Sequence, residues 1–497
     1  MQGRGSASCR VRVWSRVLWV ALGCGCGGGT TLGPSDAPID VPDHADGGTA
    51  SGSRESGQAS AGGATLDASS ASGNPDGPTT GGSALSGSSS DASPSSGTAV
   101  DGAGVAPDAA TGMVDGAVAG TAPAPVNPAE ALGSCTGPAG ASWSDSRAAY
   151  AKWKADLLTS DGARGFLRVL RPNSPNAIDT SNSEGIGYGM ILAVAMDDQS
   201  VFDSLWKYEQ LFLDGNGLMN WEIDPTGSGP TSEGTGAATD ADEDMAFALL
   251  WADERWGGQG SIGLTYRAAA VKLIDAIWQF EVDPSRGDAL APGDQFGGAS
   301  VINVSYFAPA YYRLFGKATG NVADWSSVVE SSYSILAATL NAANKNATNG
   351  LVPAWSTPAG VPQAPNASLP TNFQLDSCRT PFRIGQDFCW YGEVRAKSYL
   401  AKVSAFYQQV GAANIVNGYD LDGTPAPTNP TVHQSAAFVG PAGVGAMSDP
   451  AFSTLRDAAY AGVATLGELD GSTYYTESWT ALTLVMMNGG YWNPANP

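Results

Sequence analysis

The chain has 497 residues, with 48 Asp and Glu against 25 Lys and Arg, so its net charge at pH 7 is −23. A surface of this sign repels phosphate backbones, and no stripe of Lys and Arg runs through the sequence, which argues against a nucleic-acid partner. The two histidines, His44 and His433, are too few for a histidine-rich zinc site, and a Ser–His–Asp triad would have to use His433. We expect His433 to pack in the core or cap a helix instead.

Residues 1–26 have the features of an export signal. Four arginines precede a short apolar run at 17–22, which is followed by Gly23 and Cys24. The run is too short to span a membrane. Lipidation at Cys24 and plain signal cleavage both remain open, because small residues before a cysteine only partly match a bacterial lipobox. We expect the mature protein outside the cytoplasm, secreted or lipid-anchored at the bacterial cell surface, with no other membrane contact.

Residues 27–133 consist mainly of Gly, Ser, Ala, Thr, Asp and Pro and contain no aromatic residue. Such a segment cannot bury enough apolar surface to offset the entropy lost on ordering. We therefore predict a disordered linker here, ahead of a single folded domain over 134–497.

The folded part is predicted to be all-α. Helix-periodic apolar runs alternate with loops rich in Gly, Pro and Asn, and convincing alternating strands are few. Eleven helices with long loops on one side favour a toroid of helical hairpins over a simple bundle. The predicted helices span 147–158, 186–197, 200–213, 241–256, 265–280, 307–319, 323–343, 391–410, 435–447, 450–466 and 477–487.

Two acidic stretches stand just ahead of apolar helical runs. Glu184 lies in the first, over 183–190, and Asp240 and Asp242 lie in the second, over 236–245. A carboxylate at the start of a helix sits at the rim of the core, facing any cleft that the loops enclose. With Asp376 later in the chain, these positions indicate acid–base chemistry on a polar, uncharged substrate. The structural alternatives are an acid that interacts with its own helix dipole, a solvated acidic helix start and a cation site.

Cys378 and Cys389 lie 11 residues apart, shortly after Asp376 in the sequence. In an exported protein this spacing predicts a disulfide between them, which would contribute about 2–4 kcal/mol. Two buried free thiols are the alternative. Cys26 and Cys135 have no evident partner.

Seven stretches, in order along the chain, resemble the motifs of glycoside hydrolase family 8. The resemblance covers about 145–493 and implies an (α/α)6 barrel and inverting hydrolysis of a β-1,4-linked polysaccharide, with cellulases as the nearest relatives. The matching stretches are 183–190, 214–221, 236–245, 292–298, 305–309, 376–379 and 390–397.

The resemblance also implies roles for individual residues. Glu184 matches the proton donor, Asp376 the general base and Asp240 the carboxylate that holds the sugar at the cleavage subsite. The residues expected to bind substrate are Trp221, Asp242, Phe296, Tyr306, Trp355, Arg379 and Tyr475. The sequence departs from the family pattern at three positions, where Phe296 replaces a common Trp, Ala354 a common Asp and Cys378 a Thr. These departures leave the chemistry intact but open the question of the preferred polymer.

The proposed chemistry makes a demand on Glu184, which must stay protonated near neutral pH. Its place at a helix N-terminus favours the carboxylate, whereas burial and the like charges of Asp240 and Asp242 favour the acid. We expect the second pair of effects to win and to raise the pKa of Glu184. Inversion also requires about 6.5–9.5 Å between acid and base, to leave room for a water molecule.

The sequence thus predicts a monomeric, endo-acting, inverting glycoside hydrolase that cleaves β-1,4-glucan and needs neither a metal nor a cofactor. One alternative within the family is xylan, mixed-linkage glucan or chitosan as the substrate. Another, from a different class of protein, is a surface lipoprotein that binds glycans without cleaving them. That protein would keep the tryptophans and lose a carboxylate, and here all three carboxylates are present.

Overall fold

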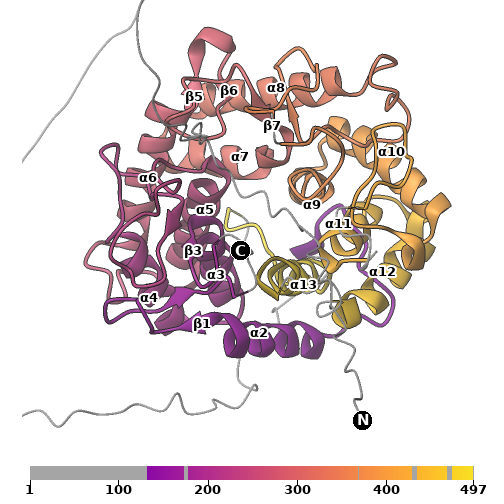
Figure 1. Cartoon of the computed structure of the whole chain (residues 1–497). Helices are drawn as coiled ribbons and strands as arrows, with labels where there is room; N and C mark the ends of the chain where they lie inside the picture. Colours follow the sequence, from indigo (N-terminus) through magenta and orange to yellow (C-terminus); the bar gives the residue numbers. More distant parts are fainter. Residues whose placement is uncertain (1–130, 173–176, 368, 428–433, 467–472, 496–497) are drawn as a thin grey trace, which may run out of the picture. The chain divides into compact units, whose positions relative to one another are not determined.

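The computed structural model describes residues 131–172, 177–367, 369–427, 434–466 and 473–495 (Figure 1). The chain divides into two units, residues 28–115 and the remainder, and every described residue belongs to the second. The predicted export signal with Cys24 and Cys26, almost all of the predicted linker, and His433 lie outside the described residues. We refer to the described part as the helical unit.

The helical unit contains twelve α-helices among its described residues. All eleven helices predicted from the sequence are confirmed, with ends that differ by a few residues, and α9 was not predicted. They are α2 (Trp143–Leu157), α3 (Ser183–Ala195), α4 (Gln199–Glu209), α5 (Thr239–Trp256), α6 (Tyr266–Glu281), α7 (Pro309–Thr319), α8 (Val322–Thr339), α9 (Thr380–Tyr391), α10 (Val394–Val410), α11 (Ala436–Ala446), α12 (Ser453–Leu466) and α13 (Thr473–Met487).

The described loops contain short elements that brace the helix ends. Each two-residue strand forms an antiparallel pair with one other strand. The pairs are β1–β2, β3–β4, β5–β6 and β7–β8. The strands are β1 (Leu158–Thr159), β2 (Arg168–Val169), β3 (Ser181–Asn182), β4 (Glu222–Ile223), β5 (Val282–Asp283), β6 (Ala289–Leu290), β7 (Ile302–Asn303) and β8 (Trp355–Ser356). The 3₁₀ turns are η1 (Pro284–Arg286), η2 (Val304–Tyr306), η3 (Ala412–Asn414) and η4 (Pro450–Phe452).

The helices form two concentric rings, which confirms the expected all-α (α/α)6 barrel. Helices α3, α5, α7, α9, α11 and α13 each pack against the next, and α13 returns to α3, so the inner ring is closed (Figure 1). Each inner helix also packs against an outer one, α4, α6, α8, α10 and α12 in turn, with α2 covering α13. Residues of α3 and α11 are buried almost all round, as expected for helices that have neighbours on every side.

Glycines in α3 let this helix pack closely against α5 of the inner ring and against α2 and α4 of the outer ring. A Cβ atom at Gly187 would lie 2.9 Å from the Cβ of Asp244, and one at Gly189 would lie 2.7 Å from Leu205 and 2.8 Å from Trp153. Neither position accepts a side chain without moving a neighbouring helix or its core residues. This close packing brings the first turns of α3 and α5 side by side.

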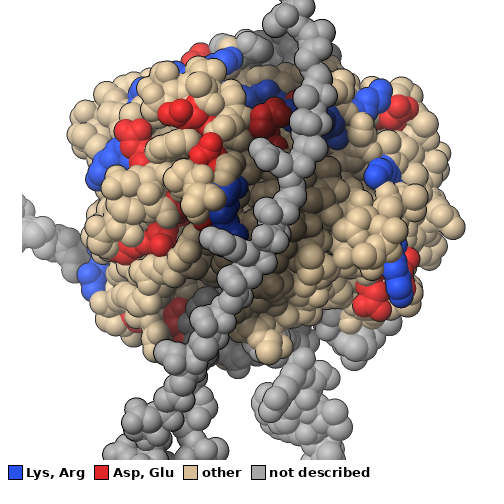
Figure 2. Space-filling view, turned by 90° about the horizontal axis from the view of Figure 1, so that it is seen from above, with Lys and Arg blue, Asp and Glu red and all other residues tan. Residues whose placement is uncertain are grey.

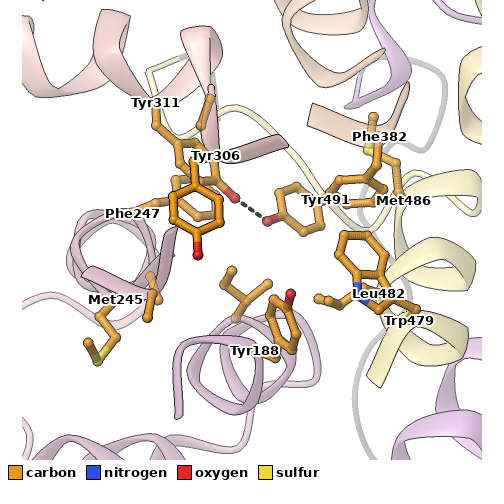
Figure 3. Packing of buried hydrophobic residues seen from close by; sticks show 14 of the residues in the cluster. Tyr188, Met245, Phe247, Tyr306, Tyr311, Phe382, Trp479, Leu482, Met486 and Tyr491 are labelled. Carbon is orange, nitrogen blue, oxygen red and sulfur yellow. Dashed lines mark hydrogen bonds between the residues drawn. The ribbon is translucent and has the colours of Figure 1, made fainter. Parts of the chain in front are cut away.

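Aromatic side chains fill the interior of the inner ring (Figure 3). Phe247 stacks on Tyr311 with ring centroids 4.2 Å apart and also on Tyr491, whose hydroxyl pairs with that of Tyr311. Tyr491 follows α13, so the end of the described chain returns to the centre of the ring. Stacked and edge-on rings of this kind add to the stability gained from burial alone.

The predicted Cys378–Cys389 disulfide is wrong. Cys389 is bonded to Cys135, 254 residues away in sequence, and Cys378 is a buried free thiol. Cys378 precedes the first turn of α9 and Cys389 lies in its last turn. A helix rises about 1.5 Å per residue, so the two Cα atoms are about 15 Å apart, whereas a disulfide requires less than about 7 Å. The prediction failed because α9 itself was not recognised.

One face of the molecule is hollowed near its middle, and most side chains around the hollow are neither acidic nor basic (Figure 2). Within the described residues, no helix combines the length and the apolar character that crossing a membrane requires.

Candidate active site

Three acidic side chains from distant parts of the chain meet at one end of the inner ring. Glu184 is the second residue of α3 and Asp240 the second residue of α5, while Asp376 lies in the loop that enters α9. In a ring of helical hairpins the inner helices run parallel, so their N-termini share one end. The capping of α3 is local: the side chain of Asn182 accepts a hydrogen bond from the backbone N–H of Gly185.

Arg379, the residue before α9, links all three acids. Its Nη1 donates to Glu184 Oε2 at 2.7 Å and also to Asp240 Oδ2, and its Nη2 lies 3.8 Å from Asp376 Oδ1. The Nε atom donates to Ser305 Oγ at 3.1 Å, which fixes the plane of the guanidinium group. Glu184 and Asp376 approach two nitrogens of one rigid guanidinium group. The distance between the nearest oxygens of their carboxyl groups is therefore below the upper limit of about 9.5 Å seen in inverting glycosidases.

Glu184 and Asp376 are the more accessible members of this group. Their side chains are 18 % and 10 % exposed, against 2 % for Asp240 and 2 % for Arg379. Asp240 and Arg379 therefore form the floor of the site, and the two accessible carboxyl groups face whatever binds above it.

Burial raises the pKa of Glu184 to about 7. The Arg379 guanidinium opposes this, Asp240 and Asp376 raise the pKa further by like-charge repulsion, and a hydrogen bond from the Tyr474 hydroxyl to Oε1 at 2.7 Å lowers it. The predicted direction is confirmed, although Asp376, rather than Asp242, joins Asp240 as the source of like charge. A carboxyl group with this pKa can hold a proton near neutral pH and also release it.

Asp376 is held from several sides. Burial raises its pKa, while the charge of Arg379, a hydrogen bond from Gln374 and the nearby indole of Trp355 lower it, and Asp240 raises it again. The Nε2 atom of Gln374 donates to Asp376 Oδ2 at 3.0 Å. A carboxyl group that is pulled in both directions in this way is poised to accept a proton once a water molecule reaches it.

Four of the aromatic residues expected to bind sugar surround these acids but are themselves buried. The Arg379 guanidinium carbon lies over the Tyr306 ring, 5.1 Å from the ring centroid. The same ring packs edge-on against Trp355, because the β7–β8 pair brings η2 beside that tryptophan. The Tyr475 hydroxyl donates to the carbonyl of Leu375, next to Asp376. Trp221, the most exposed of the four at 8 %, accepts a backbone hydrogen bond from Ser183 beside Glu184. These side chains pack around the acids and brace them.

Phe296 and Asp242, the remaining predicted substrate ligands, differ in accessibility. Phe296 is half-buried, and its ring packs beside Gly293 of the same loop. Asp242 is fully buried, and burial together with the neighbouring Glu281 and Glu209 raises its pKa well above the usual value. The structure therefore places Asp242 in the interior between α4, α5 and α6, beside two other buried acids rather than at the Arg379 cluster.

A second charged pair lies one helical turn deeper in the ring. Arg383 forms two hydrogen bonds with the Asp244 carboxylate, and its guanidinium lies over the Tyr311 ring. Arg383 and Asp244 follow Arg379 and Asp240 by four residues on α9 and α5, so two arginine–aspartate pairs stack along the same helices. That repeated i, i+4 spacing is visible in the sequence.

Two further residues of the site also escaped the sequence analysis. Tyr474 contacts Glu184 and Gln374 contacts Asp376, and neither stands in a pattern that distinguishes it from ordinary core or loop residues. Within the described residues, no group of three or more His, Cys, Asp or Glu side chains is arranged to hold a metal ion.

Comparison with known proteins adds an independent observation. The family model for glycosyl hydrolases family 8 matches residues 130–489. Endoglucanase 2 of Ruminiclostridium josui is 41 % identical over 312 residues, which is 63 % of each chain. Endoglucanase A of Acetivibrio thermocellus is 36 % identical over 349 residues, 70 % of each chain. A solved structure of a beta-1,3-1,4-glucanase from Paenibacillus sp. X4 superposes with a TM-score of 0.64 at 27 % identity, covering 72 % of this chain and 96 % of that one.

Proposed function

Because this chain belongs to glycosyl hydrolase family 8, we propose that it is an endo-acting, inverting glycoside hydrolase whose substrate is a β-1,4-glucan of the cellulose type. One observation carries the proposal: the guanidinium of Arg379 gathers Glu184, Asp240 and Asp376. The pKa of Glu184 is raised to about 7, while Asp376 accepts a hydrogen bond from Gln374. Two carboxyl groups in different environments can act as acid and base at the same pH.

In the proposed reaction Glu184 donates its proton to the glycosidic oxygen as the bond to the anomeric carbon breaks. Asp376 accepts a proton from a water molecule that attacks the opposite face of that carbon, so the configuration inverts. Glu184 is then a carboxylate, and the hydrogen bonds from Arg379 and Tyr474 stabilise this charge. Asp240 remains paired with Arg379 and supports the sugar from below.

The choice of a β-1,4-glucan is supported by the relatives named endoglucanase. Mixed-linkage glucan is a second candidate, because the solved relative is named as a beta-1,3-1,4-glucanase. The first relative is matched over less than two thirds of its length, so its substrate does not transfer to this chain without a test.

The test is release of reducing ends from carboxymethylcellulose, mixed-linkage glucan, xylan and chitosan. We expect the fastest release from carboxymethylcellulose, with an early fall in viscosity that marks cleavage inside the chain, and an α-anomeric product seen by proton NMR. Release from xylan or chitosan alone would contradict the choice of glucan, and a β-anomeric product would contradict inversion.

Two variants test the residue roles. Glu184→Gln and Asp376→Asn should each lower kcat by several orders of magnitude with an unchanged circular-dichroism spectrum and melting temperature. Glu254→Gln is the matched control, since Glu254 is an exposed acid near the far end of α5, and it should keep full activity. Near-native activity in either site variant would refute the assignment, and a protein that binds glycan without producing reducing ends would be a binding lipoprotein instead.

We also propose that the protein acts outside the cytoplasm, as the apparent export signal suggests, and that it is monomeric. The Cys135–Cys389 disulfide supports the location, because such bonds persist in oxidising compartments. Cell fractionation, with and without globomycin to block lipoprotein processing, would separate a secreted protein from an anchored one. Recovery of the mature protein in the cytoplasm would contradict both.

A further inference from the structure

We propose that Gln374 is the positioning residue for the base, holding the Asp376 carboxylate in place and favouring its charged form. The inference rests on the proposed function, since it takes Asp376 as the group that activates water. Nothing in the sequence motifs marks Gln374, which stands two residues before the base.

The side chain of Gln374 contacts Asp376 twice. Its Nε2 donates to Asp376 Oδ2 at 3.0 Å, and its Oε1 accepts from the Asp376 backbone N–H, also at 3.0 Å. The donor and acceptor of one amide thus bind the carboxylate and the main chain of the same residue. No other side chain of similar size can make both contacts. Asn is too short, Met has no polar hydrogen and Glu has no donor when it is charged.

Gln374 is itself rigidly held. Only 4 % of it is exposed, its backbone N–H donates to Ser377 Oγ at 2.8 Å, and its carbonyl accepts from the backbone N–H groups of Ser377 and Cys378. The preceding residue, Phe373, exchanges two backbone hydrogen bonds with Tyr419. The amide therefore starts from a fixed position, so its hydrogen bond orients Asp376 rather than following it.

Three groups favour the carboxylate form of Asp376: Gln374 through its hydrogen bond, the Trp355 indole and the charge of Arg379. Arg379 stands opposite the other carboxylate oxygen at 3.8 Å and is already bound to Glu184 and Asp240. Asp240 and Glu184 repel the charge of Asp376, and Tyr306 and Cys378 are neutral, since burial raises the pKa of each. Loss of the amide donor would therefore raise the pKa of Asp376.

The experiment measures the pH dependence of kcat/KM on carboxymethylcellulose for the full chain and for Gln374→Met. The acidic limb of the profile reports protonation of the base. We expect this limb to move to higher pH by about 0.5–1 unit, with a lower kcat, because one hydrogen bond to a carboxylate is lost. Gln408→Met, which changes an exposed residue of α10 in the same way, should leave the profile in place.

Gln374→Glu provides a second variant in case Gln374→Met does not fold. It keeps the size of the side chain and adds a negative charge beside Asp376, so the acidic limb should move further in the same direction. An unmoved acidic limb in a folded variant would overturn the inference and leave Gln374 with a merely structural role. If Asp376→Asn were instead fully active, the proposed function would fail whatever the two Gln374 variants did.

Discussion

Arg379 determines how the three acids differ from one another. Its guanidinium donates to Glu184 and Asp240 but only approaches Asp376, so the positive charge is shared unequally. Glu184 receives a single donor from Arg379 and another from Tyr474, and burial outweighs both. One cation therefore contacts three carboxyl groups to different degrees within one cluster.

At this scale the hydroxyl of Tyr474 offers a clean test. It donates to Glu184 Oε1 and favours the charged form, so Tyr474→Phe should raise the pKa of Glu184 above its value of about 7. The acid then stays protonated to higher pH, and the basic limb of the pH profile of kcat/KM should move upward by about 1 unit. Tyr399→Phe, which removes a buried hydroxyl of α10 with no charged group beside it, is the control. A downward shift would contradict the assigned role of Tyr474.

The residues of the site divide by how far apart their partners lie in the sequence. Glu184, Asp240, Asp376 and Arg379 could be predicted because each stands in a motif. Tyr474 could not, because its hydrogen bond spans 290 residues and depends on how α13 returns to α3. The aromatics expected to bind sugar lie around the acids and are buried, and a motif gives the position of a ring but not the depth at which it is packed.

Helices α5 and α9 hold the site together through two stacked ion pairs. Asp240 with Arg379 forms the upper pair and Asp244 with Arg383 the lower one, which is almost completely buried. The lower pair fixes the distance and rotation of the two helices, and the upper pair inherits that geometry. Because the spacing along each helix is four residues, neither pair can shift without moving the other.

The lower pair should show strong energetic coupling. Arg383→Met and Asp244→Leu should each lower the free energy of unfolding by about 3–5 kcal/mol, because each leaves one buried charge without its partner. The double variant leaves no charge and should lose less than the sum of the two. Urea denaturation followed by tryptophan fluorescence measures this. The exposed Arg395–Glu330 pair is the control, with a coupling below about 1 kcal/mol. Additive losses at the buried pair would contradict the argument.

Helix α9, the one described helix that was not predicted, shows where prediction of elements from the sequence reached its limit. Eleven helices were recognisable from apolar periodicity, but α9 carries Arg383, Gln386 and Asp387 on its buried faces. Arg383 pairs with Asp244, and Asp387 pairs with Arg313 and accepts from Tyr333. Ile384 and Phe388 keep the helical i, i+4 spacing, but they stand among buried polar residues whose partners lie on other helices. The segment therefore does not show a continuous apolar run, and local sequence did not exclude the disulfide drawn across it.

At the scale of the helical unit, the Cys135–Cys389 disulfide connects the start of the described chain to the end of α9. The backbone N–H of Ser134 donates to the carbonyl of Cys389, so the segment before α2 is held by both kinds of bond. Since the bond closes a loop of 254 residues, chain-entropy arguments give it up to about 5 kcal/mol.

Reduction should therefore destabilise the whole unit. We expect dithiothreitol, or the variant Cys135→Ser, to lower the melting temperature by several degrees in a calorimetric scan. Cys378→Ser removes the free thiol and should leave the response to reductant unchanged. If Cys378→Ser lost that response and Cys135→Ser kept it, the bond would join Cys378 to Cys389 after all.

The return of α13 to α3 has a consequence for synthesis. Glu184, the proposed proton donor, lies near the start of the ring, whereas the hydroxyl of Tyr474 that donates to it comes 290 residues later in the chain. A nascent chain still emerging from the ribosome has no complete catalytic centre, and contacts this remote along the polypeptide form slowly. Activity should therefore appear abruptly, only after the last helix has docked, and a translation product that stops short of it should be inert.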